Sequence, residues 1–260
     1  METTTRPAPQ TTPRRALQSR TALVTGAAGG LGTAITRTLV AEGVQVWAAD
    51  VRATSLKTLR EALEADPPQG TGTVRPLEID IRDPLRVAEA VATVIEADGR
   101  LDVLVNNAAV DVTLPVGELS PVDADLVIGT DLLGPIYLCL EAFPRMVAQG
   151  SGYIINILST AALQTWTEAG LYAAAKHGLR AFTHTLFQEA RRDCPEVGVT
   201  GVVAGGMRTP FITERFPDAD VSMLQEPSVV ADAIRFVLTQ PVSSLVPEIV
   251  VIPNREPTWP

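Results

Sequence analysis

The chain has 260 residues, and its 30 acidic side chains outnumber its 21 basic ones, which gives a formal net charge of −9. Hydrophobic residues make up 46% and charged residues 20%, a composition typical of a globular protein with a full core. Nucleic acid is excluded as an expected partner, because phosphate binding needs a basic face. No apolar run reaches the roughly 18 residues that span a bilayer, so no membrane contact is expected.

The chain has only two cysteines, Cys139 and Cys194, which are too few for a disulfide framework and match no metal-ligand spacing. Its two histidines, His177 and His184, have no cysteines or acidic residues arranged around them as zinc ligands. We therefore expect no metal site. Free cysteines suit a reducing compartment, and no apolar core of a signal peptide is present, so the expected location is cytoplasmic.

The first 19 residues are rich in Thr, Pro, Gln and Arg and poor in large apolar side chains. Such a segment buries too little surface to offset the entropy lost on ordering. The sequence predicts a disordered leader over residues 1–19 and a single domain over residues 20–260. A transit peptide is the alternative for the leader, although its scattered prolines would break an amphipathic helix.

From residue 20 onward, short β-branched apolar runs alternate with longer amphipathic segments. Most of the runs are typical of strands buried on both faces of a parallel sheet. Strand and helix alternating in this way predict an α/β fold, a single Rossmann-type, doubly wound parallel sheet of about seven strands with helices on both faces. The predicted strands are residues 21–25, 44–49, 72–79, 101–106, 152–158, 197–203 and 247–252. The predicted helices begin near residue 31 and continue at residues 54–65, 84–97, 121–147, 168–192 and 227–238.

A glycine-rich segment, TGAAGGLG, joins the first predicted strand to the first predicted helix. Its glycines, Gly26, Gly30 and Gly32, let the backbone turn tightly and approach a pyrophosphate, whose charge then lies at the helix N-terminus near Leu31. Asp50 follows about 20 residues later, at the end of the second predicted strand, where an acid binds the hydroxyls of an adenosine ribose. This context predicts a dinucleotide site.

The identity of the dinucleotide depends on the charges beside that ribose. Asp50 would repel a 2′-phosphate, and the glycine segment contains no basic residue, so NAD is favoured over NADP. Arg52 is close enough in sequence to keep NADP as an alternative.

Two further segments follow predicted strands, at the sheet edge where open α/β sheets bind ligands. Asp80 and Ile81 follow the third strand; the carboxylate is expected to accept a hydrogen bond from the adenine amino group, and Ile81 to pack near the ring. Asn107 and Ala108 follow the fourth strand, where small side chains would let a cofactor lie against the backbone. Both segments are therefore predicted to contact the cofactor.

Tyr172 and Lys176 lie four residues apart in a predicted helix, which places them on one face with Cβ atoms about 6 Å apart. Lys57 is the only other lysine among the 21 basic residues, and an arginine cannot replace a compact ammonium beside a phenol. A nearby positive charge favours phenolate and lowers the pKa of a tyrosine from about 10. Tyr172 is thus the predicted acid/base.

Ser159 ends the fifth predicted strand, at the same sheet edge as the glycine segment. Its hydroxyl is predicted to hydrogen-bond the substrate oxygen that Tyr172 protonates or deprotonates, with Thr160 as the neighbouring alternative. No histidine is suitably placed to activate Ser159, so hydrolase chemistry is not indicated.

Taken together, these motifs resemble those of the short-chain dehydrogenase/reductase family, over nearly the whole span from residue 20 to about residue 253. The resemblance implies that Tyr172 donates or accepts the proton, that Lys176 holds the nicotinamide ribose, and that Ser159 orients the substrate oxygen. It also implies that Thr209 contacts the nicotinamide carboxamide, so that Tyr172, Lys176 and Thr209 all belong to the cofactor site. Homodimers or homotetramers built on the long helices are expected in the same way.

The chain departs from the family pattern at three positions. Asp131, in the segment TDLLG, stands where the family usually has a catalytic Asn; Ala109 replaces a Gly and Ala204 a Pro. A carboxylate at position 131 would add negative charge near Lys176 and raise the pKa of Tyr172 by partly cancelling the lysine's field. We therefore count Asp131 among the catalytic residues and expect an alkaline-shifted rate optimum.

The sequence predicts an oxidoreductase that moves a hydride between NAD(H) and a secondary alcohol or ketone. The alternatives are an NADPH-dependent ketoreductase and a nucleotide-binding sensor or interaction protein in which Asp131 has weakened turnover. Residues 207–226 are a candidate substrate lid. The side chains expected to form an apolar substrate pocket are Leu163, Trp166, Met207, Phe211, Ile212, Phe216, Met223 and Leu224.

Overall fold

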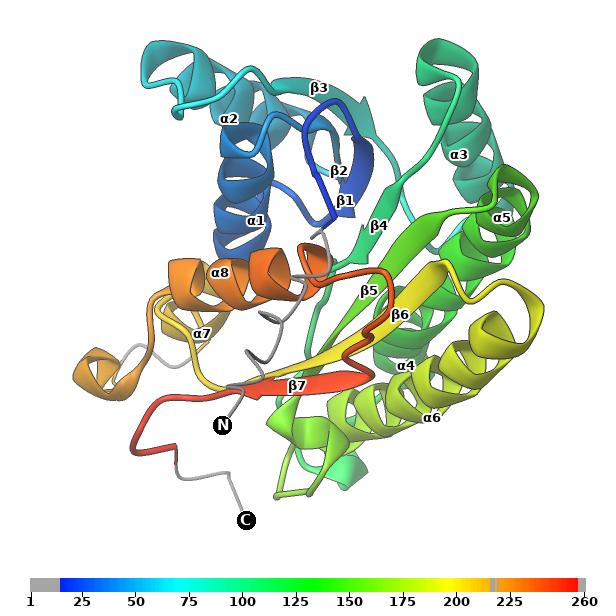
Figure 1. The fold of residues 1–260 in the computed structure, drawn as a ribbon. Coiled ribbons are helices and arrows are strands. Elements are labelled where there is room, and N and C mark those ends of the chain that lie inside the picture. The colour runs from blue at the N-terminus through cyan, green and yellow to red at the C-terminus, as the bar shows by residue number, and fades with distance from the viewer. Residues whose placement is uncertain (1–14, 216–217, 219, 257–260) are drawn as a thin grey trace, which may run out of the picture.

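The protein forms a seven-stranded, wholly parallel sheet with the strand order β3-β2-β1-β4-β5-β6-β7 (Figure 1). The structure is a computed structural model that describes residues 15–215, 218 and 220–256. The strand order confirms the predicted doubly wound α/β fold. The strands are β1 (Thr21–Thr25), β2 (Gln45–Asp50), β3 (Thr73–Glu78), β4 (Val103–Asn106), β5 (Gly152–Ser159), β6 (Val197–Ala204) and β7 (Glu248–Val251).

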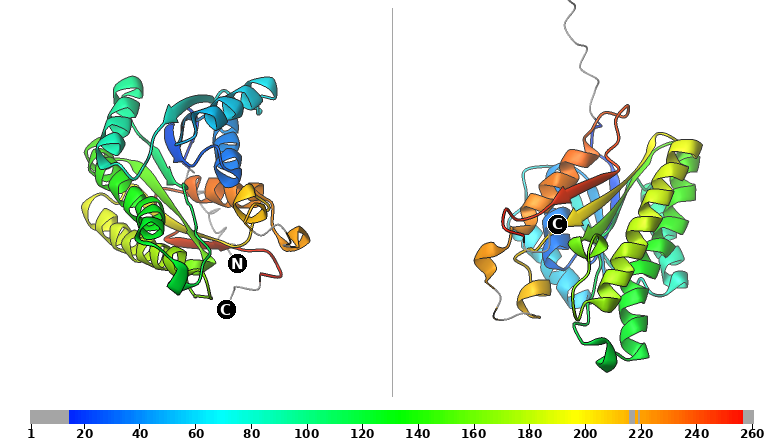
Figure 2. Two further views of the ribbon diagram at one scale, coloured as in Figure 1. Left: turned by 180° about the vertical axis from the view of Figure 1, so that it is seen from behind. Right: turned by 90° about the horizontal axis from the view of Figure 1, so that it is seen from below.

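Helices cover both faces of the sheet, as Figure 2 shows from two directions. One face packs against α1 (Gly30–Ala41), α2 (Ala53–Ala65) and α8 (Pro227–Leu238). The other packs against α3 (Pro84–Asp98), α5 (Gly134–Gln149) and α6 (Gly170–Asp193). A short helix, α7 (Pro210–Thr213), follows β6 beyond the sheet. Apart from α7, which was not predicted, and the start of α5, which continues a longer predicted helix, these bounds lie within two residues of the predicted ones, because apolar periodicity marks most elements.

The prediction that strands are buried on both faces holds for the centre of the sheet. Every residue of β1, β4 and β6 is buried. The two edge strands, β3 and β7, are largely half-buried or exposed, because each has a neighbour on one side only. The sequence of β7 is mostly apolar and does not show an edge, whereas β3 contains Arg75, Pro76 and Glu78, which suit an edge strand.

The predicted helix over residues 121–147 is built in three parts. It begins as α4 (Pro121–Ile128), passes through the π-helical turn η2 (Gly129–Leu133) and continues as α5. By length and composition the segment Pro121–Gln149 could cross a membrane, with a mean hydropathy of 1.5, contrary to our expectation that no run is long enough. Here it packs against β5, α3 and α6, and it carries the buried Asp131, so we assign it to the core.

The start of the described chain packs against the amino ends of the strands, and residues 15–19 differ in this from the disordered leader predicted over residues 1–19. Residues 1–14 lie outside the described residues. Leu17 is 6% exposed and belongs to the core, and the Ser19 amide donates to the Gly43 carbonyl at 3.0 Å. Burial of Leu17, the Ser19 hydrogen bond and the contact of Arg15 with the Tyr153 ring together anchor a segment whose composition is mostly polar.

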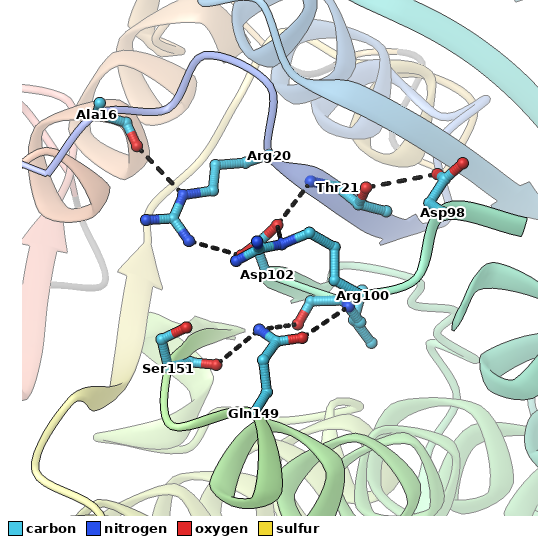
Figure 3. Close-up of polar contacts among 9 residues, drawn as sticks. Ala16, Arg20, Thr21, Asp98, Arg100, Asp102, Gln149 and Ser151 are labelled. Atoms are coloured by element: carbon cyan, nitrogen blue, oxygen red, sulfur yellow. Dashed lines mark hydrogen bonds and ion pairs between the residues drawn. The ribbon is translucent and has the colours of Figure 1, made fainter. Parts of the chain in front are cut away.

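Asp102 joins this segment to the sheet, as shown in Figure 3. Its carboxylate accepts hydrogen bonds from Arg20 at 2.7 Å, from Arg100 at 2.7 Å and from the Thr21 amide at 2.9 Å. Burial alone would raise the pKa of the Asp102 carboxyl, but these three hydrogen bonds outweigh it and hold the pKa below its usual range. The charged form of Asp102 is therefore part of the native state.

We expect Asp102→Asn to lower the free energy of unfolding. The side chain is 2% exposed, but its two arginines are 35% and 40% exposed, so solvent screening limits the loss to about 2 kcal/mol. Because the native pKa lies below the unfolded one, this contribution is present at neutral pH and disappears as the pH falls through the native pKa. Urea unfolding at pH 7 and in acid measures both effects.

Asp66→Asn is the matched control for Asp102→Asn. Asp66 also pairs with an arginine, Arg37, but its side chain is 81% exposed, so a change of under about 0.5 kcal/mol is expected. Equal losses in the two variants would contradict the special role of Asp102.

Candidate active site

A cleft of about 1020 Å³ lies at the carboxyl ends of the strands. Loops that follow β1 through β6 all contribute to its walls. Of the predicted catalytic and cofactor-binding residues, Asp131 alone lies outside the lining. The predicted residues that line the cleft are Gly26, Gly30, Leu31, Gly32, Asp50, Asp80, Ile81, Asn107, Ala108, Ser159, Tyr172, Lys176 and Thr209.

The glycine turn between β1 and α1 is shaped by close approaches of backbone. Gly26 has a φ of +60°, and a Cβ there would lie 2.7 Å from the Ala108 Cα atom. A side chain at Gly30 would meet Thr209 at 2.5 Å. Asn107 donates from Nδ2 to the carbonyl oxygens of Thr25 at 2.8 Å and Gly26 at 3.1 Å, so this side chain braces the turn.

The N-terminus of α1 is suited to an anionic group. Its N-cap, Gly29, provides no side-chain cap, and the first turn contains no acidic residue. The amide groups of this turn therefore keep their hydrogen-bonding capacity and their partial positive charge for a ligand in the cleft. This observation fits the pyrophosphate of a dinucleotide.

Asp50 lies at the end of β2 beside this turn, where the carboxylate is 5% exposed. Oδ2 accepts a hydrogen bond from the Ala28 amide at 3.2 Å, and Oδ1 accepts from the Arg52 side chain at 3.1 Å. Arg52 is 57% exposed, and its hydrogen bond with Asp50 raises the pKa of the guanidinium. An arginine thus stands directly beside the acid that was predicted to select NAD.

The predicted adenine contacts, Asp80 and Ile81, differ in their surroundings. Arg82 donates from Nε to the Asp80 carboxylate at 2.9 Å, and this hydrogen bond holds the pKa of Asp80 below its usual range. Ile81 is 6% exposed and packs against Gly134 at the start of α5. Both line the cleft, but the pairing of Asp80 with Arg82 was not visible in the sequence.

Three predicted catalytic side chains meet at the other end of the cleft. Tyr172 and Lys176 come from the first turns of α6, and the Lys176 ammonium lies 5.4 Å from the centroid of the Tyr172 ring. A hydrogen bond links the side chains of Tyr172 and Ser159, which ends β5. The Ser159 hydroxyl also accepts from the Ala161 amide at 3.2 Å, which fixes its direction.

Asp131 does not line the cleft but contacts Lys176 from the protein interior. The Asp131 side chain is fully buried in η2, and its Oδ2 lies 3.2 Å from the Lys176 ammonium. Its Oδ1 accepts a hydrogen bond from the Val110 amide at 2.8 Å, and Lys176 donates to the Ile157 carbonyl at 3.3 Å. π-Helical turns are frequent at functional sites, and this one aims a carboxylate at the lysine.

These buried charges set the acidities of the site. Burial raises the pKa of Asp131 to about 6, against the opposing effect of Lys176. Burial alone would lower the pKa of Lys176, but Asp131, Tyr172 and Asp111 together outweigh it, so that pKa is raised.

The phenol does not follow the expectation that Lys176 brings its pKa down toward working pH. Burial raises the pKa of Tyr172, the Lys176 ammonium opposes this, and the Asp131 carboxylate adds to the rise. The net pKa is above the usual value of a tyrosine. The sequence indicated the lysine's effect but not the depth of burial.

The segment predicted as a lid, residues 207–226, is tied down at both ends. The Arg208 amide donates to the Gln225 carbonyl at 2.9 Å, and the Gln225 amide donates to the Gly206 carbonyl at 3.1 Å. Phe216 lies outside the described residues. Of the other side chains predicted to form the apolar pocket, those that line the cleft are Trp166, Met207, Phe211 and Ile212, and those that do not are Leu163, Met223 and Leu224.

Sequence reasoning missed five charged residues in the cleft wall: Arg82, Asp111, Glu214, Arg215 and Glu256. Asp111 lies four residues beyond Asn107 in the same loop, so its place after a strand was an available signal. Arg215 follows α7, and nothing in its sequence context indicates that it turns inward. Among the described residues, no group of three or more His, Cys, Asp or Glu side chains is arranged to hold a metal ion.

Comparison with known proteins agrees with this geometry. The chain matches the family model for short chain dehydrogenases over residues 20–220. It is 30% identical to an uncharacterised oxidoreductase of Staphylococcus haemolyticus over 91% of this chain and 98% of that protein. It is 32% identical to the 3-oxoacyl-[acyl-carrier-protein] reductase of Thermotoga maritima over 78% of this chain and 79% of that protein.

A solved structure of a metagenomic short-chain oxidoreductase in complex with NADP superposes with a TM-score of 0.80, at 29% identity. The superposition covers 92% of this chain and all of that one. With the parallel sheet, the glycine turn and the clustered Ser, Tyr and Lys side chains already established, these matches show that the chain belongs to the short-chain dehydrogenase/reductase family.

Proposed function

We propose that this oxidoreductase transfers a hydride between NAD(H) and a secondary alcohol or ketone, with Tyr172 as the acid/base. One observation carries the proposal. The side chains of Tyr172, Lys176 and Ser159 converge at one end of a cleft whose other end holds an uncapped helix N-terminus and Asp50. A dinucleotide lying along the cleft would have its phosphates at the helix and its nicotinamide near the phenol.

The nicotinamide, when bound, supplies or accepts the hydride. Tyr172 is proposed to move the matching proton, donating it to a carbonyl oxygen in reduction and accepting it from a hydroxyl in oxidation. The Ser159 hydroxyl holds that substrate oxygen in line with the phenol. Lys176 favours the phenolate through its charge and, with Thr209, holds the cofactor.

The cofactor is proposed to be NAD, because a carboxylate at the end of β2 beside the glycine turn, as Asp50 provides, would repel a 2′-phosphate. NADP remains the second candidate on one specific observation, the exposed Arg52 guanidinium beside Asp50. A similar structure contains NADP, which also favours that alternative.

A second candidate function is a nucleotide-binding protein with weakened turnover. The observation in its favour is the buried ion pair between Asp131 and Lys176, which engages the lysine needed beside the phenol. Binding of NADH without turnover of any alcohol or ketone would favour this candidate.

We further propose that the protein acts in the cytoplasm as a homodimer or homotetramer. Both cysteines are free and buried, which suits a reducing compartment. Leu140 on α5 and Phe236 on α8 are 60% and 49% exposed and would be covered by a second copy of the chain.

Tyr172→Phe is expected to lower kcat by about 10³-fold, because the phenol's proton transfer is lost while the ring remains. The dissociation constant for NADH should change less than about threefold, since the fold and the rest of the cleft are kept. Steady-state kinetics and NADH fluorescence measure the two quantities. The matched control is Tyr137→Phe, a tyrosine outside the cleft lining, which should keep wild-type kcat; a fully active Tyr172→Phe variant would contradict the assignment.

Asp131→Asn is expected to shift the pH profile of alcohol oxidation about one unit toward acid. The carboxylate raises the pKa of Tyr172, so its removal makes the phenolate available at lower pH. Because the pKa of Asp131 is about 6, the two profiles should converge below that pH, where the wild-type carboxyl is protonated. Asp125→Asn, on the exposed side of α4, is the control, and coincident profiles for wild type and Asp131→Asn would contradict the account.

Asp50→Asn is expected to raise the ratio of NADPH to NADH affinity by about tenfold, because the carboxylate's repulsion of a 2′-phosphate is lost and Arg52 is released. Adding Arg52→Leu to this variant should remove the gain. Dissociation constants for both reduced cofactors, measured by fluorescence, test this. An unchanged ratio in Asp50→Asn would show that Asp50 does not select the cofactor.

A further inference from the structure

The substrate end of the cleft has a polar wall that the proposed reaction does not use. Asp111 and Thr113 belong to the loop after β4, and Arg215 follows α7. All three line the cleft together with Tyr172. Two chain segments that lie about a hundred residues apart in sequence thus meet beside the proposed catalytic tyrosine.

The Asp111 carboxylate is held by two side chains that both contact its Oδ2 atom, and the Val112 backbone also acts on it. Arg215 Nη1 lies 3.5 Å from Oδ2, and the Thr113 hydroxyl donates to Oδ2 at 3.3 Å. Arg215 Nη2 donates to the Asp111 carbonyl oxygen at 3.1 Å, which fixes the guanidinium against the loop. The Asp111 side chain is 10% exposed and that of Arg215 20%.

The other carboxylate oxygen, Oδ1, is buried and has no hydrogen-bond partner among the described residues. A buried acceptor of this kind is costly to leave unpaired, so a donor is expected to reach it. Since Asp111 lines the cleft, that donor can come from a molecule bound there.

Asp111 is close enough to the catalytic group for one substrate to reach both. The Arg215 guanidinium lies 4.3 Å from the centroid of the Phe211 ring, whose centroid is 6.0 Å from that of Tyr172. The charge of Asp111 is also felt at both Tyr172 and Lys176. Only one aromatic ring separates the Arg215 side of the wall from the phenol.

The charges of the wall favour a neutral donor. Asp111 and Arg215 together carry no net charge. A cationic group at Oδ1 would lie beside the Arg215 cation, and an anionic group at Arg215 would lie beside the Asp111 carboxylate. A hydroxyl avoids both repulsions, because its hydrogen can be donated to Oδ1 while its oxygen accepts from the guanidinium.

We propose that Asp111 binds a second hydroxyl group of the substrate, so that the enzyme prefers diols and hydroxyketones to simple alcohols and ketones. This inference rests on the proposed function, which supplies the first hydroxyl or carbonyl at Tyr172. Trp166 and Phe211 provide apolar surface for the carbon skeleton between the two oxygens. The apolar pocket expected from the sequence thus has one polar side, formed by Asp111, which would bind the second hydroxyl group of the substrate.

The test compares substrates of one carbon skeleton with NAD as the oxidant. We would measure kcat/KM for cyclohexanol, for the 1,2- and 1,3-cyclohexanediols, and for their monomethyl ethers. Each ether keeps the second oxygen but cannot donate a hydrogen bond from it. Wild type is expected to prefer at least one diol over its own ether by about tenfold or more, as a hydrogen bond to a charged acceptor provides.

Three variants assign this preference to Asp111. Asp111→Leu should bring the diol-to-ether ratio close to one, and the isosteric Asp111→Asn should reduce it, because the charged acceptor is lost. Glu118→Gln is the matched control, since it removes an exposed carboxylate from the same loop after β4, outside the cleft lining, and should leave the ratio unchanged.

The outcomes are distinguishable. Equal turnover of every diol and its ether by wild type overturns the inference. This outcome is measured on the wild-type protein alone and does not depend on whether a variant folds. A preference that survives in Asp111→Leu also overturns it. Absence of turnover with all of these substrates and with the corresponding ketones, despite NADH binding, contradicts the proposed function itself and removes the basis of the inference with it.

Discussion

The shared direction of the seven strands is the constraint on which the site depends. Because the sheet is wholly parallel, the loops after β1 through β6 open at one edge, and the cleft lies there. The central strands are buried on both faces, so their ends are held rigidly. Residues far apart in the sequence can then be placed within hydrogen-bond distance, as Thr25 and Asn107 are, 82 residues apart. Without that common edge the glycine turn and the tyrosine would not face one cleft.

In the cleft at this edge of the sheet, pairs of opposite charges set the acidity of Tyr172. Lys176 is opposed by Asp131, and Asp111 is opposed by Arg215, so the phenol of Tyr172 lies among two cations and two anions. Burial amplifies each interaction, because little solvent screens it. The basicity of Tyr172 is therefore a property of the whole group. The π-helical turn η2 is part of this arrangement, since it directs Asp131 at the lysine from outside the cleft.

Much of this arrangement could be predicted from the sequence. Apolar runs and helical periodicity located the elements, and Gly26, Asp50, Ser159 and Tyr172 follow from motif spacing. The rest depends on long-range packing that local patterns do not encode. The sequence predicted a charge at Asp131 but not how deeply the carboxylate is buried, and the inward turn of Arg215 has no local signal. The Asp80–Arg82 pair is local, two residues apart, and was not predicted. Leu17 likewise shows its contact with the core only once the sheet is formed.

The account's central claim is that hydride passes directly between a nicotinamide and the substrate carbon beside Tyr172. Incubating the protein with a ketone and NADH that is stereospecifically deuterated at C4 tests this claim most directly. Mass spectrometry of the alcohol should show one deuterium on the carbinol carbon with one C4 epimer of the cofactor and none with the other. An alcohol that carries no deuterium from either epimer, or no alcohol at all from any ketone, would contradict the account.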